Sequence, residues 1–143
     1  SNLVANAGGN TPGFQAYASS DQTGVSDSTW TKVNLGAEIY DSDNKFGQQY
    51  RTDIGPIDIL AERKDGKGFL VIELKRDRAS DKVIGQILRY MGYVEKHLCT
   101  DNQTVSGCII AQEKDQNLEY ALTRTNDVEF LRYELNFRLT NES

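Results

Sequence analysis

The chain has 143 residues, a net charge of −5, 38% hydrophobic residues and 26% charged residues. This length is sufficient for one domain with its own hydrophobic core but too short for two such domains of ordinary size. No apolar run approaches the roughly 18 residues of a membrane span, and the first residues lack the basic and apolar regions of a signal peptide, so we expect a soluble, cytoplasmic protein without a membrane partner.

The cysteine and histidine content argues against a zinc site. The chain has two cysteines, Cys99 and Cys108, and a single histidine, His97. Four nitrogen or sulfur ligands cannot be assembled from this set. We expect both thiols to be reduced, as in an intracellular protein, and Cys108 to be a small buried residue of the apolar run GCIIA.

Positive charge is concentrated in the middle of the chain. Residues 45–96 contain 11 Lys or Arg against 8 Asp or Glu, whereas both flanking segments are acidic. An overall acidic chain ordinarily counts against nucleic-acid binding. The uneven distribution leaves two alternatives open: a basic surface around a functional site, or solvated charge without a partner.

The N-terminal third predicts loops and one broken strand. Residues 5–28 are rich in Gly, Asn, Ser and Thr and predict loop, with at most a short strand over 14–18. Residues 29–40 alternate between apolar and polar positions, which predicts a half-buried strand with a break at Gly36. Residues 41–44, DSDN, predict a turn.

The central stretch predicts a hairpin followed by a helix. Strands are expected over 54–63 and 69–75, joined by a turn at Asp65-Gly66, and residues 76–80 predict loop. The helix is expected over 81–98, capped by Ser80 or Asp81. Its apolar residues recur at three- and four-residue spacing: Val83, Ile84, Ile87, Leu88, Met91, Val94 and Leu98.

The C-terminal part predicts a strand over 105–112, a short helix over 117–124 and a last strand over 128–139. In the last segment, apolar residues occupy every second position, so one face of the strand should be solvated. The order β-β-β-α-β-α-β predicts an α/β fold, in which helices flank a mixed central sheet.

Three residues of the hairpin predict a metal site. Glu73 and Lys75 are two residues apart on a strand, so their side chains share a face. Asp58 and Glu73 are symmetric about the Asp65-Gly66 turn, which places them opposite each other with Cβ atoms roughly 4.5–5.5 Å apart. Two facing carboxylates repel unless a cation lies between them, and Mg²⁺ suits such an oxygen-rich site.

Each residue type has a role in phosphodiester chemistry. We expect Asp58, Glu73 and the Leu74 carbonyl to hold the metal, which would polarise a phosphoryl oxygen and acidify a water. Lys75 would orient that water and stabilise charge developing at phosphorus. An E-x-K sequence alone is more often an exposed ion pair.

Gln86 and Tyr90 follow on the predicted helix. They are four residues apart and therefore lie on the same helix face, where they could orient Lys75, the water or a DNA phosphate. In the simpler interpretation, Tyr90 fills the core and Gln86 lies on the surface.

The segments YRTDIGPIDIL, FLVIELKR and GQILRYMGYV resemble the PD-(D/E)xK nuclease superfamily. They are most similar to the C-terminal catalytic domain of NucS-type (EndoMS) mismatch and branched-DNA endonucleases, over about residues 46–139. The resemblance implies a restriction-endonuclease-like fold and a Mg²⁺- or Mn²⁺-dependent DNA endonuclease of DNA repair. It also implies that Asp58, Glu73 and Lys75 are catalytic and that Gln86 and Tyr90 support them.

The expected partner is DNA, with single-stranded, branched or mismatched forms favoured over a particular duplex sequence, because backbone contacts carry little sequence information. The Tyr50-Arg51 pair also matches the family, so Arg51 is expected to contact a phosphate. Arg76, Arg78 and Arg89 are the other expected nucleic-acid contacts.

The N-terminal segment departs from this family. Residues 14–46 resemble the opening strands of C1q-like jelly-roll domains, where the superfamily usually has a first helix. We therefore expect a β-rich segment over 1–45, a nuclease-like core over 46–143 and a single compact domain overall. A partner chain could cover the sheet face that lacks this helix, which predicts a homodimer.

Two alternatives to an active nuclease remain open. The chain could be a nucleic-acid-binding module that keeps the fold without catalysis, although binding alone has no need for paired carboxylates. It could also be a mosaic protein whose nuclease half is a relic.

Overall fold

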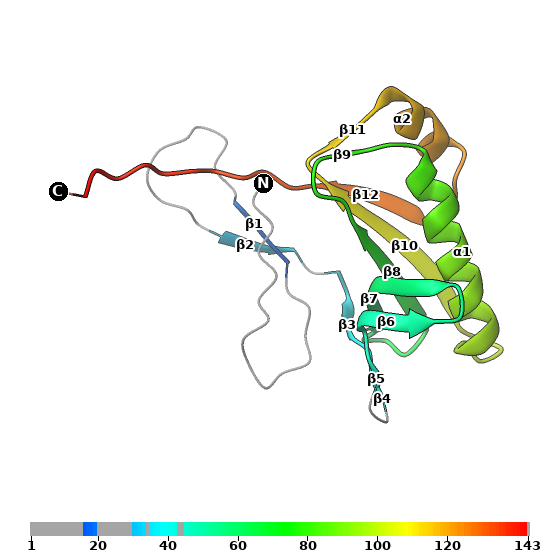
Figure 1. Cartoon of the computed structure of the whole chain (residues 1–143). Helices are drawn as coiled ribbons and strands as arrows, with labels where there is room; N and C mark the ends of the chain where they lie inside the picture. Colours follow the sequence, from blue (N-terminus) through cyan, green and yellow to red (C-terminus); the bar gives the residue numbers. More distant parts are fainter. Residues whose placement is uncertain (1–15, 20–29, 34, 43–44, 143) are drawn as a thin grey trace.

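The structure is a computed structural model that describes residues 16–19, 30–33, 35–42 and 45–142. Its centre is a mixed sheet with the strand order β12-β10-β8-β7-β3, in which β6 also pairs with β7 (Figure 1). These strands are β3 (Ala37–Ile39), β6 (Gln48–Thr52), β7 (Gly55–Arg63), β8 (Gly68–Leu74), β10 (Thr104–Ala111) and β12 (Val128–Arg132). The predicted α/β class is confirmed, and β6 is an additional strand.

The connections explain the mixed pairing. β7 is antiparallel to β8, β3 and β6, whereas β8, β10 and β12 are parallel to one another. Parallel strands require long crossovers, and these contain α1 (Lys82–His97) and α2 (Gln116–Thr123). Asp81 occupies the N-cap of α1 without a side-chain cap bond, while the Asp115 side chain accepts a bond from the Leu118 N–H and caps α2.

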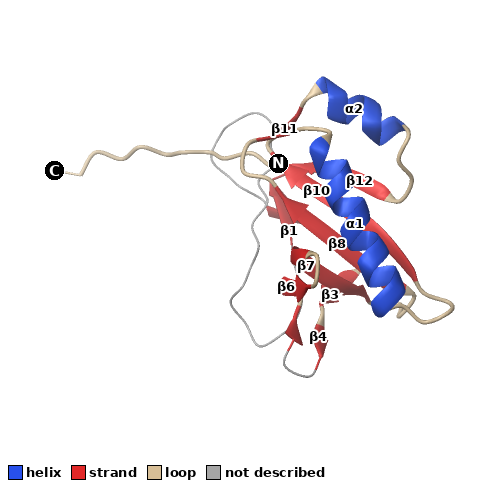
Figure 2. Cartoon of the chain, turned by 45° about the vertical axis from the view of Figure 1, so that its right-hand side comes forward, coloured by secondary structure: helices blue, strands red, loops and turns tan. Residues whose placement is uncertain are grey.

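Helix α1 runs along one face of the sheet in both views (Figures 1 and 2). Its buried residues are Val83, Ile87, Tyr90, Met91 and Val94. The predicted stripe was wrong at Leu88, whose side chain is 44% exposed. Tyr90 is buried instead, because it lies one turn beyond Ile87 and Gln86 on the side that meets the sheet. None of the described helices combines the length and apolarity needed to cross a bilayer.

The opposite face of the sheet is also buried within one copy of the chain. Ile59, Leu70, Ile72, Cys108 and Ile110 form a second apolar cluster there, and Ile72 and Cys108 are fully buried. Burial raises the pKa of the Cys108 thiol to about 12, which agrees with its predicted role as a small apolar residue. These residues are therefore buried without the cover that was expected from a partner chain.

Among the residues that the structure describes, three short strand pairs lie outside the central sheet. They are β1 (Ala16–Ser19) with β2 (Trp30–Val33), β4 (Asp41–Ser42) with β5 (Lys45–Phe46), and β9 (Arg78–Ala79) with β11 (Glu113–Lys114). The strand expected over 29–40 is divided near Gly36, which has a φ of +64°. The loop expected over 76–80 was wrong in part, because β9 pairs within it. Residues 14–15, 43 and 44 lie outside the described part of the chain.

The last strand is shorter than predicted. β12 ends at Arg132, and the Tyr133 N–H still donates to the Ala111 carbonyl over 3.0 Å. β10 also ends at Ala111, so the following residues continue past the end of their neighbouring strand. Leu135, Phe137 and Leu139 are 60, 87 and 97% exposed, and Figure 1 shows this segment extending away from the sheet.

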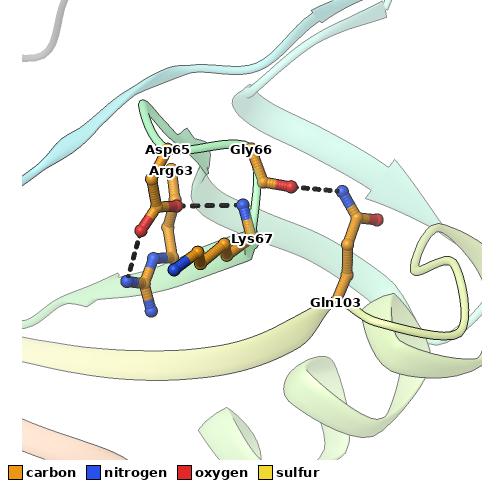
Figure 3. Close-up of polar contacts among 5 residues, drawn as sticks. All are labelled: Arg63, Asp65, Gly66, Lys67 and Gln103. Atoms are coloured by element: carbon orange, nitrogen blue, oxygen red, sulfur yellow. Dashed lines mark hydrogen bonds and ion pairs between the residues drawn. The ribbon is translucent and has the colours of Figure 1, made fainter.

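The turn between β7 and β8 is held by polar contacts (Figure 3). Asp65 pairs with the Arg63 guanidinium at 2.8 Å and accepts a bond from the Lys67 N–H at 2.9 Å. These contacts lower the pKa of Asp65, the backbone bond contributing most. The Gln103 amide donates to the Gly66 carbonyl over 3.1 Å, which ties the hairpin to the loop between α1 and β10.

Candidate active site

Asp58 and Glu73 face each other across β7 and β8. The register pairs Ile59 with Ile72 and Leu60 with Val71, and its next step brings Asp58 opposite Glu73, as the symmetry about Asp65-Gly66 predicts. The Leu74 N–H donates to Oδ2 of Asp58 over 2.9 Å. This bond fixes the Asp58 carboxylate at the end of β8, on the side of the sheet that α1 covers.

Glu73 is the only charged residue among the buried side chains that the structure describes. It is 1% exposed, and its Oε1 atom has no hydrogen-bond partner. Burial is the main reason that its pKa rises from 4.5 to about 7. The negative charge of Asp58 and hydrogen bonding between the two carboxyls raise the pKa further, and Lys75 opposes the shift.

Lys75 is joined to the helix behind the sheet. Its Nζ atom donates to Oε1 of Gln86 over 3.1 Å, and its backbone N–H donates to the Ile110 carbonyl over 2.8 Å. Because Lys75 is two residues beyond Glu73 on the same side of the chain, the Gln86 contact holds an ammonium group beside the paired carboxylates.

Tyr90 reaches the same region from α1. Its ring is buried, with 5% exposure, so the simpler interpretation of Tyr90 as core filler is correct for the ring. The hydroxyl lies against Gly55, where an added Cβ atom would come within 2.8 Å of it. Gly55 also has a φ of +119°, so both the backbone and the space available favour glycine here.

Gln49 is a residue of this site that the sequence did not predict. Its Nε2 atom lies 3.4 Å from Oδ1 of Asp58, on the strand β6 that the prediction also missed. Gln49 has a φ of +50°, in the left-handed region that few non-glycine residues occupy. No local sequence pattern indicates this conformation.

The four candidate DNA-binding arginines come from four different parts of the fold. Arg51 lies on β6, Arg76 follows β8, Arg78 lies on β9 and Arg89 lies on α1. All four are exposed. The Arg78 guanidinium pairs with Glu113 at 3.3 Å, and the Arg76 carbonyl accepts a bond from the Tyr133 hydroxyl.

The residues present fit a divalent cation that takes few protein ligands. Among the described residues, no group of three or more His, Cys, Asp or Glu side chains is clustered, so a cation here would rely on Asp58 and Glu73. Mg²⁺ is commonly held by one or two carboxylates together with waters and substrate oxygens. The unpartnered Oε1 of Glu73 is the atom such a cation would satisfy.

The mixed sheet, with paired carboxylates and a lysine at the end of its central hairpin, places the protein in the restriction-endonuclease-like class. Residues 39–141 match the family described as "Endonuclease NucS C-terminal domain". The chain therefore belongs to the NucS C-terminal domain family.

Two solved structures are similar to the chain in fold. One is a repair endonuclease from Pyrococcus abyssi, with 22% identity and a TM-score of 0.55 over 69% of this chain and 39% of that one. The other is EndoMS in a complex with double-stranded DNA, with 19% identity and a TM-score of 0.55 over 73% of this chain and 40% of that one. The chain thus spans about two-fifths of either structure.

Proposed function

We propose that this domain hydrolyses phosphodiester bonds of DNA with the help of Mg²⁺ or Mn²⁺. One observation carries the proposal: Glu73 is a buried carboxyl group with an unpartnered oxygen, directly across the hairpin from Asp58. Burying one carboxyl beside another is costly. A bound cation would offset that cost and would leave both carboxylates ionised.

In this proposal, Asp58, Glu73 and the Leu74 carbonyl hold the cation. When bound, it would polarise a phosphoryl oxygen and lower the pKa of a water. The Leu74 N–H bond to Asp58 supports the proposal, because it orients one carboxylate oxygen before any ligand arrives.

Lys75, Gln86 and Tyr90 complete the proposed centre. The Lys75 ammonium stabilises negative charge that develops on the phosphoryl oxygens, and the bond to Gln86 limits the positions that this long side chain can occupy. The Tyr90 hydroxyl, which lies beside Gly55, would donate to a phosphate or to a water.

DNA is the proposed substrate because the chain belongs to an endonuclease family and EndoMS, which shares its fold, has been solved with double-stranded DNA. Exposed Arg51, Arg76 and Arg89 are the proposed phosphate contacts, whereas Arg78 must first leave Glu113. Phosphate contacts position DNA without reading its sequence. We therefore propose single-stranded, branched or mismatched DNA as the substrate, within DNA repair.

We also propose that the protein is cytoplasmic and forms a homodimer. In the family pattern a helix precedes the hairpin, whereas the described residues before Lys82 contain strands but no helix. A single copy nevertheless buries the residues of both sheet faces, so the proposal does not rest on an uncovered face. Light scattering at working concentration would give twice the 16.0 kDa mass of the chain. A monomer mass at that concentration would contradict the homodimer.

The function is tested by incubating the protein with labelled single-stranded, mismatched and flapped DNA, in Mg²⁺, Mn²⁺ or EDTA. We expect cleavage that needs the cation and that Lys75→Ala abolishes. Lys67→Ala is the matched control, because Lys67 lies at the opposite end of the same hairpin. DNA binding without cleavage by the wild type would favour a non-catalytic module, and absence of both would favour a relic.

A further inference from the structure

Gln49 has a backbone conformation that its residue type does not favour. Its φ of +50° lies in the left-handed region, where glycine and asparagine are the usual occupants. The flanking residues still pair regularly with β7, since Gln48 pairs with Ile59 and Tyr50 with Ile57. The unusual conformation is therefore confined to one residue, directly opposite Asp58.

The Gln49 side chain contacts the carboxylate of Asp58. Its Nε2 atom approaches Oδ1 of Asp58 at 3.4 Å, while the Leu74 N–H binds Oδ2 at 2.9 Å. Asp58 is thus contacted from β6 on one side and from β8 on the other. A carboxylate held at both oxygens has fewer accessible rotamers, so less ordering remains to be done when a cation binds.

A strained backbone outlier next to a functional group supports a hypothesis of function. If Gln49 served only to shape the strand, glycine or asparagine would adopt the same φ at lower cost. A glutamine at this position has a side chain long enough to reach Asp58. The benefit of Gln49 therefore lies in its amide group.

We propose that Gln49 is a positioning residue that orients the Asp58 carboxylate for a divalent cation. The inference rests on the proposed function, because it concerns the same metal site. It extends the site to a third strand, so that residues of β6, β7 and β8 form one row beside the cation. Gln49 acts through Asp58 and is not assigned a contact with the substrate.

The test is calorimetric titration of Mn²⁺ into the wild-type protein and two variants. Gln49→Gly removes the amide but accommodates the positive φ, so it separates the side chain from the backbone requirement. Gln48→Ala is the matched control, since the neighbouring side chain is exposed and has no contact with Asp58 among the described hydrogen bonds. Circular dichroism melts of all three proteins monitor folding.

We expect Gln49→Gly to weaken Mn²⁺ binding about 10- to 100-fold, the range typical of residues that orient metal ligands. Its melting midpoint should be no lower than that of the wild type, and Gln48→Ala should bind as the wild type does. Equal Mn²⁺ affinity of Gln49→Gly and wild type would overturn the inference and leave the proposed function intact. Absence of Mn²⁺ binding by the wild type would instead overturn the proposed function, and the inference with it.

Discussion

Asp58 and Glu73 lie opposite each other on β7 and β8, and the buried Glu73 has an Oε1 atom without a partner. The pair is therefore electrostatically strained when both groups are ionised. The repulsion between the carboxylates favours cation binding, because a divalent ion between them would attract both and offset their repulsion.

This strain predicts a pH dependence of stability. The pKa of Glu73 is raised in the folded state, from 4.5 to about 7, so its contribution to stability is fully present below pH 4.5 and is lost as the pH rises through 7. Integrated over that window, the loss is about 3 kcal/mol. Urea unfolding in EDTA should show the free energy of unfolding of the wild type falling between pH 5 and pH 8 relative to that of Glu73→Gln. Parallel pH profiles for the two proteins would count against the proposed strain.

Cation binding should restore the lost stability. At pH 8, a Mg²⁺ concentration 100 times the dissociation constant would stabilise the wild type by about 2.7 kcal/mol. Asp58→Asn should lose most of this effect, whereas the exposed Asp53→Asn, in the turn before β7, should keep it. Thermal melts with and without Mg²⁺ measure the difference. An equal Mg²⁺ effect in Asp58→Asn and wild type would mean that the cation binds elsewhere.

Gly55→Ala should lower the free energy of unfolding, in part through a clash with Tyr90. An alanine there must adopt a φ of +119° with its Cβ 2.8 Å from the Tyr90 hydroxyl, at a cost of about 1–3 kcal/mol for the backbone alone. Adding Tyr90→Phe to Gly55→Ala should recover only the part of the lost stability that is due to the clash with the Tyr90 hydroxyl. Gly85→Ala is the control, since that helical glycine has open space around it, and it should stabilise α1 by roughly 0.5–1 kcal/mol. Urea denaturation compares all four proteins, and a neutral Gly55→Ala would refute the close approach.

The segment after β12 should tolerate polar substitutions. Phe137 is 87% exposed, so Phe137→Ser should change the free energy of unfolding by less than about 0.5 kcal/mol. Ile109→Ala, at a fully buried position of β10, should cost about 2–5 kcal/mol. A comparably large loss in Phe137→Ser would show that this segment packs in solution.

The hairpin and its register could be predicted from the sequence because their determinants are local. Asp65-Gly66 specifies the turn, and a turn fixes which residues of the two strands face each other. The positions of Asp58, Glu73 and Lys75 follow from that register. The sequence also predicts that Gln86 could orient Lys75, and the Lys75 Nζ atom donates to Oε1 of Gln86 over 3.1 Å.

The errors arise where the outcome depends on distant neighbours. Alternating residues beyond Arg132 predict a strand, but a strand needs a partner backbone, and β10 ends at Ala111. Leu88 has the spacing of a core residue, yet it is exposed, because the buried side of α1 runs through Ile87, Tyr90, Met91 and Val94. Gln49 has no local pattern that indicates a positive φ, so its contact with Asp58 is seen only once β6 is placed beside β7.

The most direct test of the central claim is an anomalous difference map from a crystal of the protein soaked in Mn²⁺. A cation held by the two carboxylates should give a peak between Asp58 and Oε1 of Glu73, about 2.0–2.3 Å from the carboxylate oxygens, and crystals of Asp58→Asn should lack this peak. A fully occupied Mn²⁺ site elsewhere, with no density between these two carboxylates, would contradict the account.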